Sequence, residues 1–351
     1  MWASGVAAQA PPRHVNAYVL IDTGPVRVPA PCACISSPFT VATPRPGWGY
    51  PDGPAAPSDD AKPSDAAREE QRRRDAEDRA KLPLLVEQAQ EGNANASFAI
   101  ALQLLAGTPG PHENEQAAAW LGLAARQDHA DAFILLGHNY SHGIGVPRNA
   151  KAAAYWYGAG ATRGDKNAMV ALGLLYAAGR GVEQDWSAGA RWWARAAAAG
   201  VPIASRFLGD AYACGLGVDQ DHERAVAEYR RAADKGEMSS SVQLGHMYRS
   251  GCARADDEVM AAAYQKAADR GDPEAQIALS ALFFEGRGVE QVFYRAYFWA
   301  RLAERRLPPG ELRASAQAHA AKAARLMSAF ELKDAETFIE SVVAAASTPM
   351  R

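Results

Sequence analysis

Hydrophobic and polar positions repeat along residues 93–306 with a period of 36 residues. A Leu-Gly pair recurs at this interval, and a tyrosine follows each pair at the same distance. These positions are Leu136, Gly137, Tyr140, Leu172, Gly173, Tyr176, Leu208, Gly209, Tyr212, Leu244, Gly245 and Tyr248. A further copy, with Leu279 and Ser280, follows after 35 residues. Self-similarity at a fixed period is typical of stacked structural units, so the pattern predicts a tandem-repeat fold.

Within one repeat the apolar residues fall at helical spacing in two stretches. In residues 168–176 they lie on one arc of a helix, and Gly173 lies on that arc. Glycine weakens a helix by about 1 kcal/mol, so Gly173 predicts close approach of a neighbouring helix. Gly179 is expected to end this helix in the left-handed conformation, and Asp185 to cap the start of the next. The capping residues of the other repeats are expected to be Asn149, Asp221 and Asp256.

The second helix of each repeat carries aromatic residues and ends in an Ala-Ala pair and a glycine. Because the Trp192-Trp193 pair recurs in register as other aromatics, we interpret it as core packing. One such hairpin cannot bury both of its faces, whereas stacked copies can. The pattern therefore predicts an all-α fold, a right-handed α-solenoid of helix-turn-helix repeats.

The order Ala-x-x-x-Leu-Gly-x-x-Tyr-x-x-Gly-x-Gly-Val, followed by Asp, Ala, Trp-Tyr and Ala-Ala-x-x-Gly, resembles the Sel1-like repeat (SLR) family, relatives of tetratricopeptide repeats. The resemblance covers residues 93–306, with five good copies and a degenerate first copy. The last copy has Ser280 for glycine and Val292 for the capping residue. The resemblance implies an interaction scaffold, often in bacterial envelope, signalling or host-contact settings. Cysteine-rich members carry a disulfide in each repeat, a pattern that this sequence lacks.

The remaining chain divides into three segments. Residues 1–64 are rich in Pro, Ala, Gly and Ser and are expected to be disordered. Residues 65–92 are expected to form a charged leading helix and an N-terminal cap. Residues 307–351 are expected to form capping helices, over about 311–328 and 331–347, because a solenoid needs a polar outer face at its end.

Composition limits the classes of partner that the chain is expected to bind. The formal net charge of −3 argues against nucleic acid as a partner, and no apolar run is long enough for membrane insertion. No standard signal peptide is recognisable, so the cytoplasm is the default location, with periplasm and secretion as open alternatives. The four cysteines do not form a disulfide framework, and we expect free thiols.

The sequence predicts no catalytic residue, no metal site and no cofactor. His138 and His142 lie four residues apart, a spacing that could ligate a metal, but no third ligand is evident and surface histidines are favoured. The Gly-x-Gly-Val loops lack the strand, lysine and hydroxyl residue of a phosphate-binding loop.

The arc of each first helix that lies opposite the recurring Leu-Gly and Tyr positions is not required for stacking of the repeats. We expect residues of this arc to line a mixed polar and apolar concave groove for a peptide or protein partner. The candidates are His138, Leu174, Arg206, Asp210, His246, Arg249 and Phe284. The competing interpretation is that these residues are ordinary surface or inter-repeat packing.

The leading hypothesis for function is a non-catalytic protein-interaction scaffold or adaptor. Two alternatives stay open. An envelope-associated hydrolase would show convergent titratable residues in one pocket, whereas a scaffold shows an extended groove. A regulatory subunit would dock through residues 1–64, with the repeats as a spacer.

Overall fold

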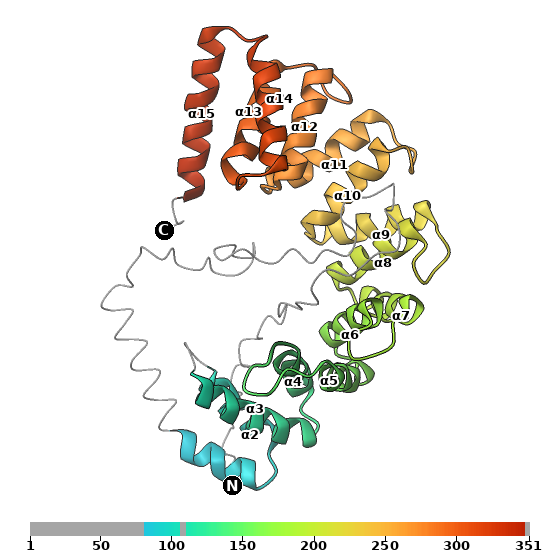
Figure 1. Cartoon of the computed structure of the whole chain (residues 1–351), viewed down its shortest axis with the longest axis vertical. Helices are drawn as coiled ribbons and strands as arrows, with labels where there is room; N and C mark the ends of the chain where they lie inside the picture. The colour runs from blue at the N-terminus through green and yellow to red at the C-terminus, as the bar shows by residue number, and fades with distance from the viewer. Residues whose placement is uncertain (1–80, 106–109, 348–351) are drawn as a thin grey trace, which may run out of the picture. The chain divides into compact units, whose positions relative to one another are not determined.

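The computed structural model describes residues 81–105 and 110–347, and every regular element in these ranges is a helix. A helical segment covers residues 81–90. The helices that follow are α2 (Ala94–Leu104), α3 (Pro111–Arg126), α4 (Ala130–His142), α5 (Ala150–Thr162), α6 (Lys166–Ala178), α7 (Trp186–Ala198), α8 (Pro202–Cys214), α9 (His222–Asp234), α10 (Met238–Arg249), α11 (Asp257–Asp269), α12 (Pro273–Glu285), α13 (Phe293–Arg306), α14 (Glu311–Ala324) and α15 (Ala329–Ser347) (Figure 1). The predicted all-α solenoid is confirmed. The disorder expected for residues 1–64 and most of the leading helix lie outside the described residues.

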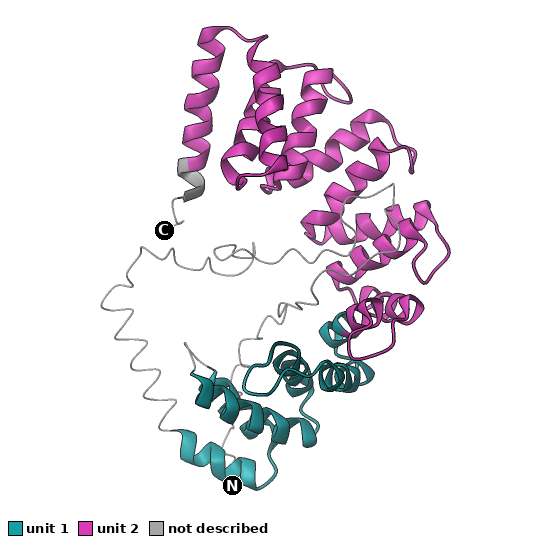
Figure 2. Cartoon of the chain, viewed as in Figure 1, with its two compact units in different colours: residues 1–24, 41–45, 63–171 teal, residues 25–40, 46–62, 172–351 magenta. Residues whose placement is uncertain are grey.

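The described chain forms two compact units that divide after residue 171, within α6 (Figure 2). The core of the first unit includes Phe98, Leu121 and Phe133. The core of the second includes Tyr229 and Tyr264. In each unit the two helices of a repeat pack against one another, as α4 does against α5 and α8 against α9.

A glycine facing an aromatic ring holds the two helices of a repeat together. A Cβ atom built on Gly173 would lie 2.4 Å from Nε1 of Trp193, which is fully buried. Gly137, Gly209 and Gly245 face Tyr157, Tyr229 and Tyr264 in the same way. The predicted reason for the glycine, close helix approach, is therefore confirmed.

The last repeat exchanges both members of this pair. Ser280 stands in the glycine position, and the position of the ring, eight residues after the cap, is held by Ala300. The space left by the missing ring admits the serine, whose hydroxyl donates to the carbonyl oxygen of Ala296 at 2.7 Å. The departure from the repeat pattern is thus a compensated change in packing.

The predicted N-caps are confirmed in three repeats. The side chains of Asn149, Asp185 and Asp221 each accept a hydrogen bond from the backbone N–H three residues later. Asp256 also stands at a helix N-cap, but its side chain makes no capping hydrogen bond. Its loop is one residue shorter than the others, which changes the approach of the chain to α11.

Helices α14 and α15 both form side-chain hydrogen bonds with α13, and those of α15 converge on one acidic residue. Glu336 accepts hydrogen bonds from the hydroxyl of Tyr297 at 2.5 Å, from Arg301 at 2.8 Å and from Arg305 at 2.9 Å. Burial and the Glu336 carboxylate raise the pKa of Tyr297 to about 12. On α14, Gln317 donates to Glu304 at 3.0 Å. These bonds fix α15 beside the last repeat.

Candidate binding surface

The groove candidates differ in their accessibility. His138 lies in the first unit and is half-buried, and the other six candidates lie in the second unit. Leu174, Arg206, Asp210 and His246 are buried, Phe284 is half-buried and Arg249 is exposed. The expectation that packing leaves this arc free is therefore wrong for the four buried side chains. Sequence periodicity locates the arc of a helix but not the side chains that cover it.

Arg206 and Asp210 form an ion pair inside the second unit. Nη1 of Arg206 lies 3.0 Å from Oδ2 of Asp210, and both side chains are at most 2% exposed. The hydroxyl of Tyr229 on α9 donates to Oδ1 of Asp210 at 2.7 Å, and Nε of Arg206 lies 3.7 Å from Glu237. Burial and the Asp210 charge raise the pKa of Tyr229 well above its ordinary value. Removing one partner from such a network would leave a buried charge uncompensated.

A second network occupies the equivalent place in the next repeat. Arg249 donates to Nδ1 of His246 at 2.7 Å, so Nε2 of the ring carries the proton and donates to Glu274 of α12 at 3.1 Å. The hydroxyl of Tyr264 lies 3.4 Å from Nδ1, and burial raises the pKa of Tyr264 to about 12. The chain from Arg249 to Glu274 joins two successive first helices, and it has an exposed guanidinium at one end.

The rings of His138 and His142 in the first unit are in contact but tilted by 34°, with centroids 4.2 Å apart. The N–H at Nδ1 of His142 donates to the carbonyl oxygen of His138 at 3.0 Å, a contact within one helix. Burial, with a smaller contribution from His142, lowers the pKa of His138 to about 4. His138 is thus neutral near pH 7, and it is half-buried rather than on the surface as expected. Over residues 81–105 and 110–347, no cluster of three potential metal ligands is present.

The expectation of free thiols is wrong for the two cysteines in the described part of the chain. Cys214 and Cys252 are both disulfide-bonded. Cys214 is the last residue of α8, and Cys252 lies in the loop after α10. Their positions are not equivalent in the repeat, so the period carried no signal of a bond. Cys32 and Cys34 lie outside the described residues.

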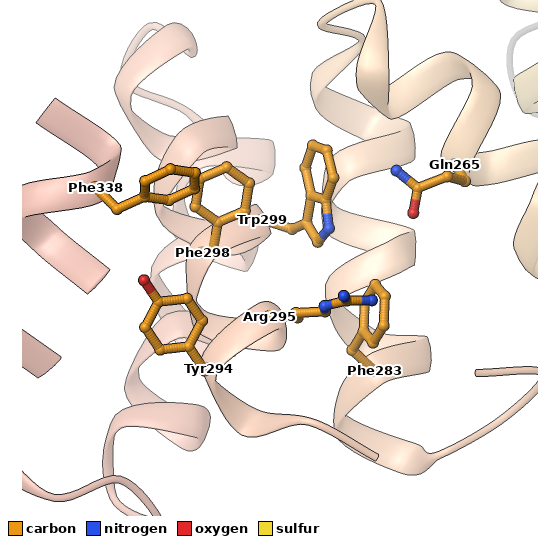
Figure 3. Close-up of a pocket in the computed structure, with 7 residues that line it drawn as sticks. All are labelled: Gln265, Phe283, Tyr294, Arg295, Phe298, Trp299 and Phe338. Atoms are coloured by element: carbon orange, nitrogen blue, oxygen red, sulfur yellow. The ribbon is translucent and has the colours of Figure 1, made fainter. Parts of the chain in front are cut away.

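An aromatic pocket of about 410 Å³ opens on the second unit between α11, α12, α13 and α15 (Figure 3). Its lining residues are Gln265, Phe283, Tyr294, Arg295, Phe298, Trp299 and Phe338. The ring of Phe298 lies 5.0 Å from that of Trp299 and 5.4 Å from that of Phe338, between centroids. The guanidinium of Arg295 lies 5.4 Å from the centroid of Phe283.

Sequence reasoning missed this pocket. Phe298 and Trp299 stand two residues and one residue before the position of the core ring, which Ala300 holds in this repeat, so the period did not predict that they meet an aromatic partner. The pocket depends on Phe338 of α15, which lies outside the repeat pattern and is 49% exposed. The available signal was Ala300, which replaces the buried ring of the other repeats.

Among the described helices, none has the length and apolarity needed to cross a bilayer.

Comparison with known proteins agrees with this architecture. The sequence pattern of the family described as Sel1 repeat matches residues 94–129, 130–165, 166–201, 202–237, 242–272 and 273–306. No curated protein matches the chain.

Two solved structures are similar to the chain. One is c5321, a protective antigen present in uropathogenic Escherichia coli strains that displays an SLR fold, with 29% identity and a TM-score of 0.61 over 70% of this chain and 56% of c5321. The other is a Sel1 repeat protein from Oxalobacter formigenes, with 27% identity and a TM-score of 0.55 over 62% of this chain and 86% of that protein. Because the six matched segments cover more than half of the sequence, the chain belongs to the Sel1 repeat family, whose members typically mediate protein–protein interactions.

Proposed function

We propose that the chain is a non-catalytic scaffold that binds a peptide or protein partner on the first-helix surface of its second unit. Arg249 and the half-buried Phe284 define this surface, and the buried candidates lie beneath it: Leu174, Arg206, Asp210 and His246. Sel1 repeats are generally a non-catalytic scaffold fold, which supports a binding role over the hydrolase alternative.

The observation that carries the proposal is the hydrogen-bonded chain from Arg249 through His246 to Glu274. It holds an exposed guanidinium in a fixed position across two successive first helices. A side chain already ordered in the free protein loses less entropy when it binds, and arginine is enriched at the centres of interfaces. Arg249 therefore contacts the partner directly, and the buried His246 positions it.

Phe284 supplies the apolar part of the contact. Its ring is half-buried at the end of α12 and packs against Phe293, with centroids 5.6 Å apart. A partly exposed ring held by a second ring offers apolar area at low entropic cost. The buried Leu174, Arg206 and Asp210 shape the surface from below. A partner that carries a carboxylate beside an apolar residue fits this combination.

A phage-displayed random peptide library, panned against the full chain under reducing conditions, tests the proposal. Selected peptides should bind Arg249→Glu and Phe284→Ala at least about tenfold more weakly than the parent, as interface hot spots do. The matched controls are Arg191→Glu on α7 and Phe330→Ala on α15, whose side chains are exposed elsewhere on the second unit. Peptides that bind all four variants equally would move the site away from this surface.

A further inference from the structure

The aromatic pocket of the second unit is a cavity that the proposed function does not use. Its lining comes from the second helices α11 and α13, from α15 and from one residue of α12. Arg249 and Phe284, by contrast, belong to the first helices α10 and α12. The volume of about 410 Å³ falls in the range of ligand pockets, about 300–1,000 Å³. The pocket therefore has room for one aromatic side chain and the backbone groups beside it.

Aromatic rings form one end of this pocket. Figure 3 shows Tyr294, Phe298 and Phe338 together at this end, with Trp299 next to them. The ring of Phe298 is tilted by 38° against that of Phe338 and stands edge-on to that of Trp299. Rings in such a cluster pack favourably against a further ring in offset or edge-to-face contact. This end of the pocket therefore favours a planar apolar group.

Two hydrogen bonds hold the ring end in place in the free protein. The hydroxyl of Tyr294 donates to Oδ2 of Asp334 at 3.1 Å, and that of Tyr297 donates to Glu336 at 2.5 Å. Because both bonds join α13 to α15, they keep Phe338 in contact with the rings of α13. A pocket that is formed before binding loses less conformational entropy when the ligand enters.

The other end of the pocket carries a positive charge and no carboxylate. The guanidinium of Arg295 lies 5.4 Å from the centroid of Phe283, so a cation–π contact orients it at the pocket. Within residues 81–105 and 110–347, no carboxylate forms an ion pair with Arg295. None of the lining residues is acidic. The pocket therefore favours an anion, whereas an ammonium ion, which rings alone would attract, meets a like charge.

Gln265 adds a hydrogen-bond acceptor at the polar end. Its Nε2 donates to Asp269 at 2.6 Å, which leaves Oε1 to accept a hydrogen bond from a ligand. A free amino acid would bring an ammonium group for which the lining offers no carboxylate. The N–H of a peptide bond is neutral and needs only one acceptor. An anionic carboxylate beside a peptide N–H occurs at the carboxyl terminus of a polypeptide.

We propose that the pocket binds the carboxy-terminal residue of a peptide or protein partner when that residue is aromatic. The terminal carboxylate pairs with Arg295 and accepts a hydrogen bond from the indole N–H of Trp299. The aromatic side chain packs against Phe298 and Phe338. Oε1 of Gln265 accepts the backbone N–H of the terminal residue. Each group of that residue thus meets a side chain of complementary chemistry, and the site reads a chain end rather than an internal segment.

Isothermal titration calorimetry of the full chain with four short peptides tests the ligand chemistry. The first probe is acetyl-Gly-Ser-Gly-Phe with a free carboxylate, and the others end in phenylalanine amide, in alanine with a free carboxylate and in trimethyllysine amide. The phenylalanine amide and alanine peptides should bind at least about tenfold more weakly than the first, because each lacks one recognised group. Tighter binding of the trimethyllysine peptide, or no binding of the first peptide at about 1 mM, would overturn the proposal.

Variants of the pocket test the assigned contacts. Arg295→Gln should bring the ratio between the affinities for the phenylalanine carboxylate and amide peptides close to one, and Phe338→Ala should weaken both peptides alike. The matched controls are Arg191→Gln on α7 and Phe330→Ala on α15, whose exposed side chains lie outside the pocket, and they should bind like the parent. Circular dichroism verifies that all four variants stay helical. An unchanged preference for the carboxylate in Arg295→Gln would refute the pairing.

A fifth probe, 3-phenylpropionate, distinguishes a chain end from a free aromatic carboxylate. It has the ring and the carboxylate but no N–H, so Gln265→Leu should weaken the phenylalanine peptide about threefold or more and leave 3-phenylpropionate unaffected. Equal affinity of the parent for the two ligands would overturn recognition of a chain end. Arg249→Glu should leave every affinity unchanged, so this inference and the proposed function can fail independently.

Discussion

Substituting Gly245 with alanine tests whether this glycine is present to admit a buried ring. A Cβ atom at this position in α10 would lie 2.5 Å from Cε1 and Cζ of Tyr264. The tyrosine is fully buried, so its ring cannot move without displacing close-packed neighbours. Two effects of opposite sign therefore compete: alanine improves helix propensity, and it overpacks the core.

The overpacking is expected to win. Replacing glycine with alanine in a helix interior gains about 1 kcal/mol, whereas an inserted methyl group that forces a packed core apart costs about 1–3 kcal/mol. Because the new methyl group would contact several ring atoms at once, we expect its cost to lie at the upper end of that range. We expect Gly245→Ala to lower the free energy of unfolding by about 1–2 kcal/mol. The matched control is Gly158→Ala in α5, where a Cβ meets nothing within 4 Å, and it should stabilise by about 1 kcal/mol.

Removing the ring should reverse the sign. Tyr264→Ala alone is expected to cost about 3–5 kcal/mol, as large-to-small aromatic substitutions in cores do. In that background Gly245→Ala should stabilise, because its Cβ now enters the space the ring has left. The last repeat already combines a side chain, Ser280, with Ala300 at the ring position.

Urea and thermal unfolding, followed by far-ultraviolet circular dichroism, would measure these effects. Midpoints are compared rather than extrapolated free energies, since repeat arrays depart from two-state unfolding. A midpoint for Gly245→Ala that rises as far as that of Gly158→Ala would refute the packing argument. The argument would also be refuted if Gly245→Ala lowered the midpoint of the Tyr264→Ala variant as much as it lowers that of the parent.

Three further predictions concern capping, titration and the core. Asp185→Ala should lower the free energy of unfolding by about 1 kcal/mol, because the Asp185 carboxylate caps α7. Asp256→Ala should lower it by less, because Asp256 makes no capping hydrogen bond, and comparing the unfolding midpoints of the two variants tests this difference. The folded pKa of His138 lies near 4, below its unfolded value, so the unfolded chain binds more protons between pH 4 and 6.5 and stability falls as the pH drops through this window. His138→Asn should flatten the pH dependence there, and unchanged pH dependence of the midpoint would contradict the depressed pKa. Trp193→Ala should cost about 3–5 kcal/mol, and a shift in midpoint no larger than that of Asp185→Ala would show that Trp193 is not a core residue.

The sequence by itself determined the all-α repeat fold. The Leu-Gly period located the first helices, and the residue types at recurring positions predicted their contacts. Gly173 faces the ring of Trp193, as expected for a glycine that lets two helices approach closely. Asp185 caps the start of α7, as its position in the repeat predicted. These features are local, since they depend on residues within one repeat and on its nearest neighbours, and the repetition shows each of them several times.

Only the tertiary structure decided which candidate side chains are accessible. Arg206, Asp210 and His246 are buried in hydrogen-bonded networks, and Arg249 is exposed beside one of them. The aromatic pocket requires Phe338 of α15 to meet the last repeat. The oxidation of the described cysteines likewise depends on atoms brought together in space. The sequence period specifies the features that all repeats share. Side-chain accessibility, pockets and disulfides depend on positions where the repeats differ and on contacts between segments distant in the sequence, so tertiary packing decides them.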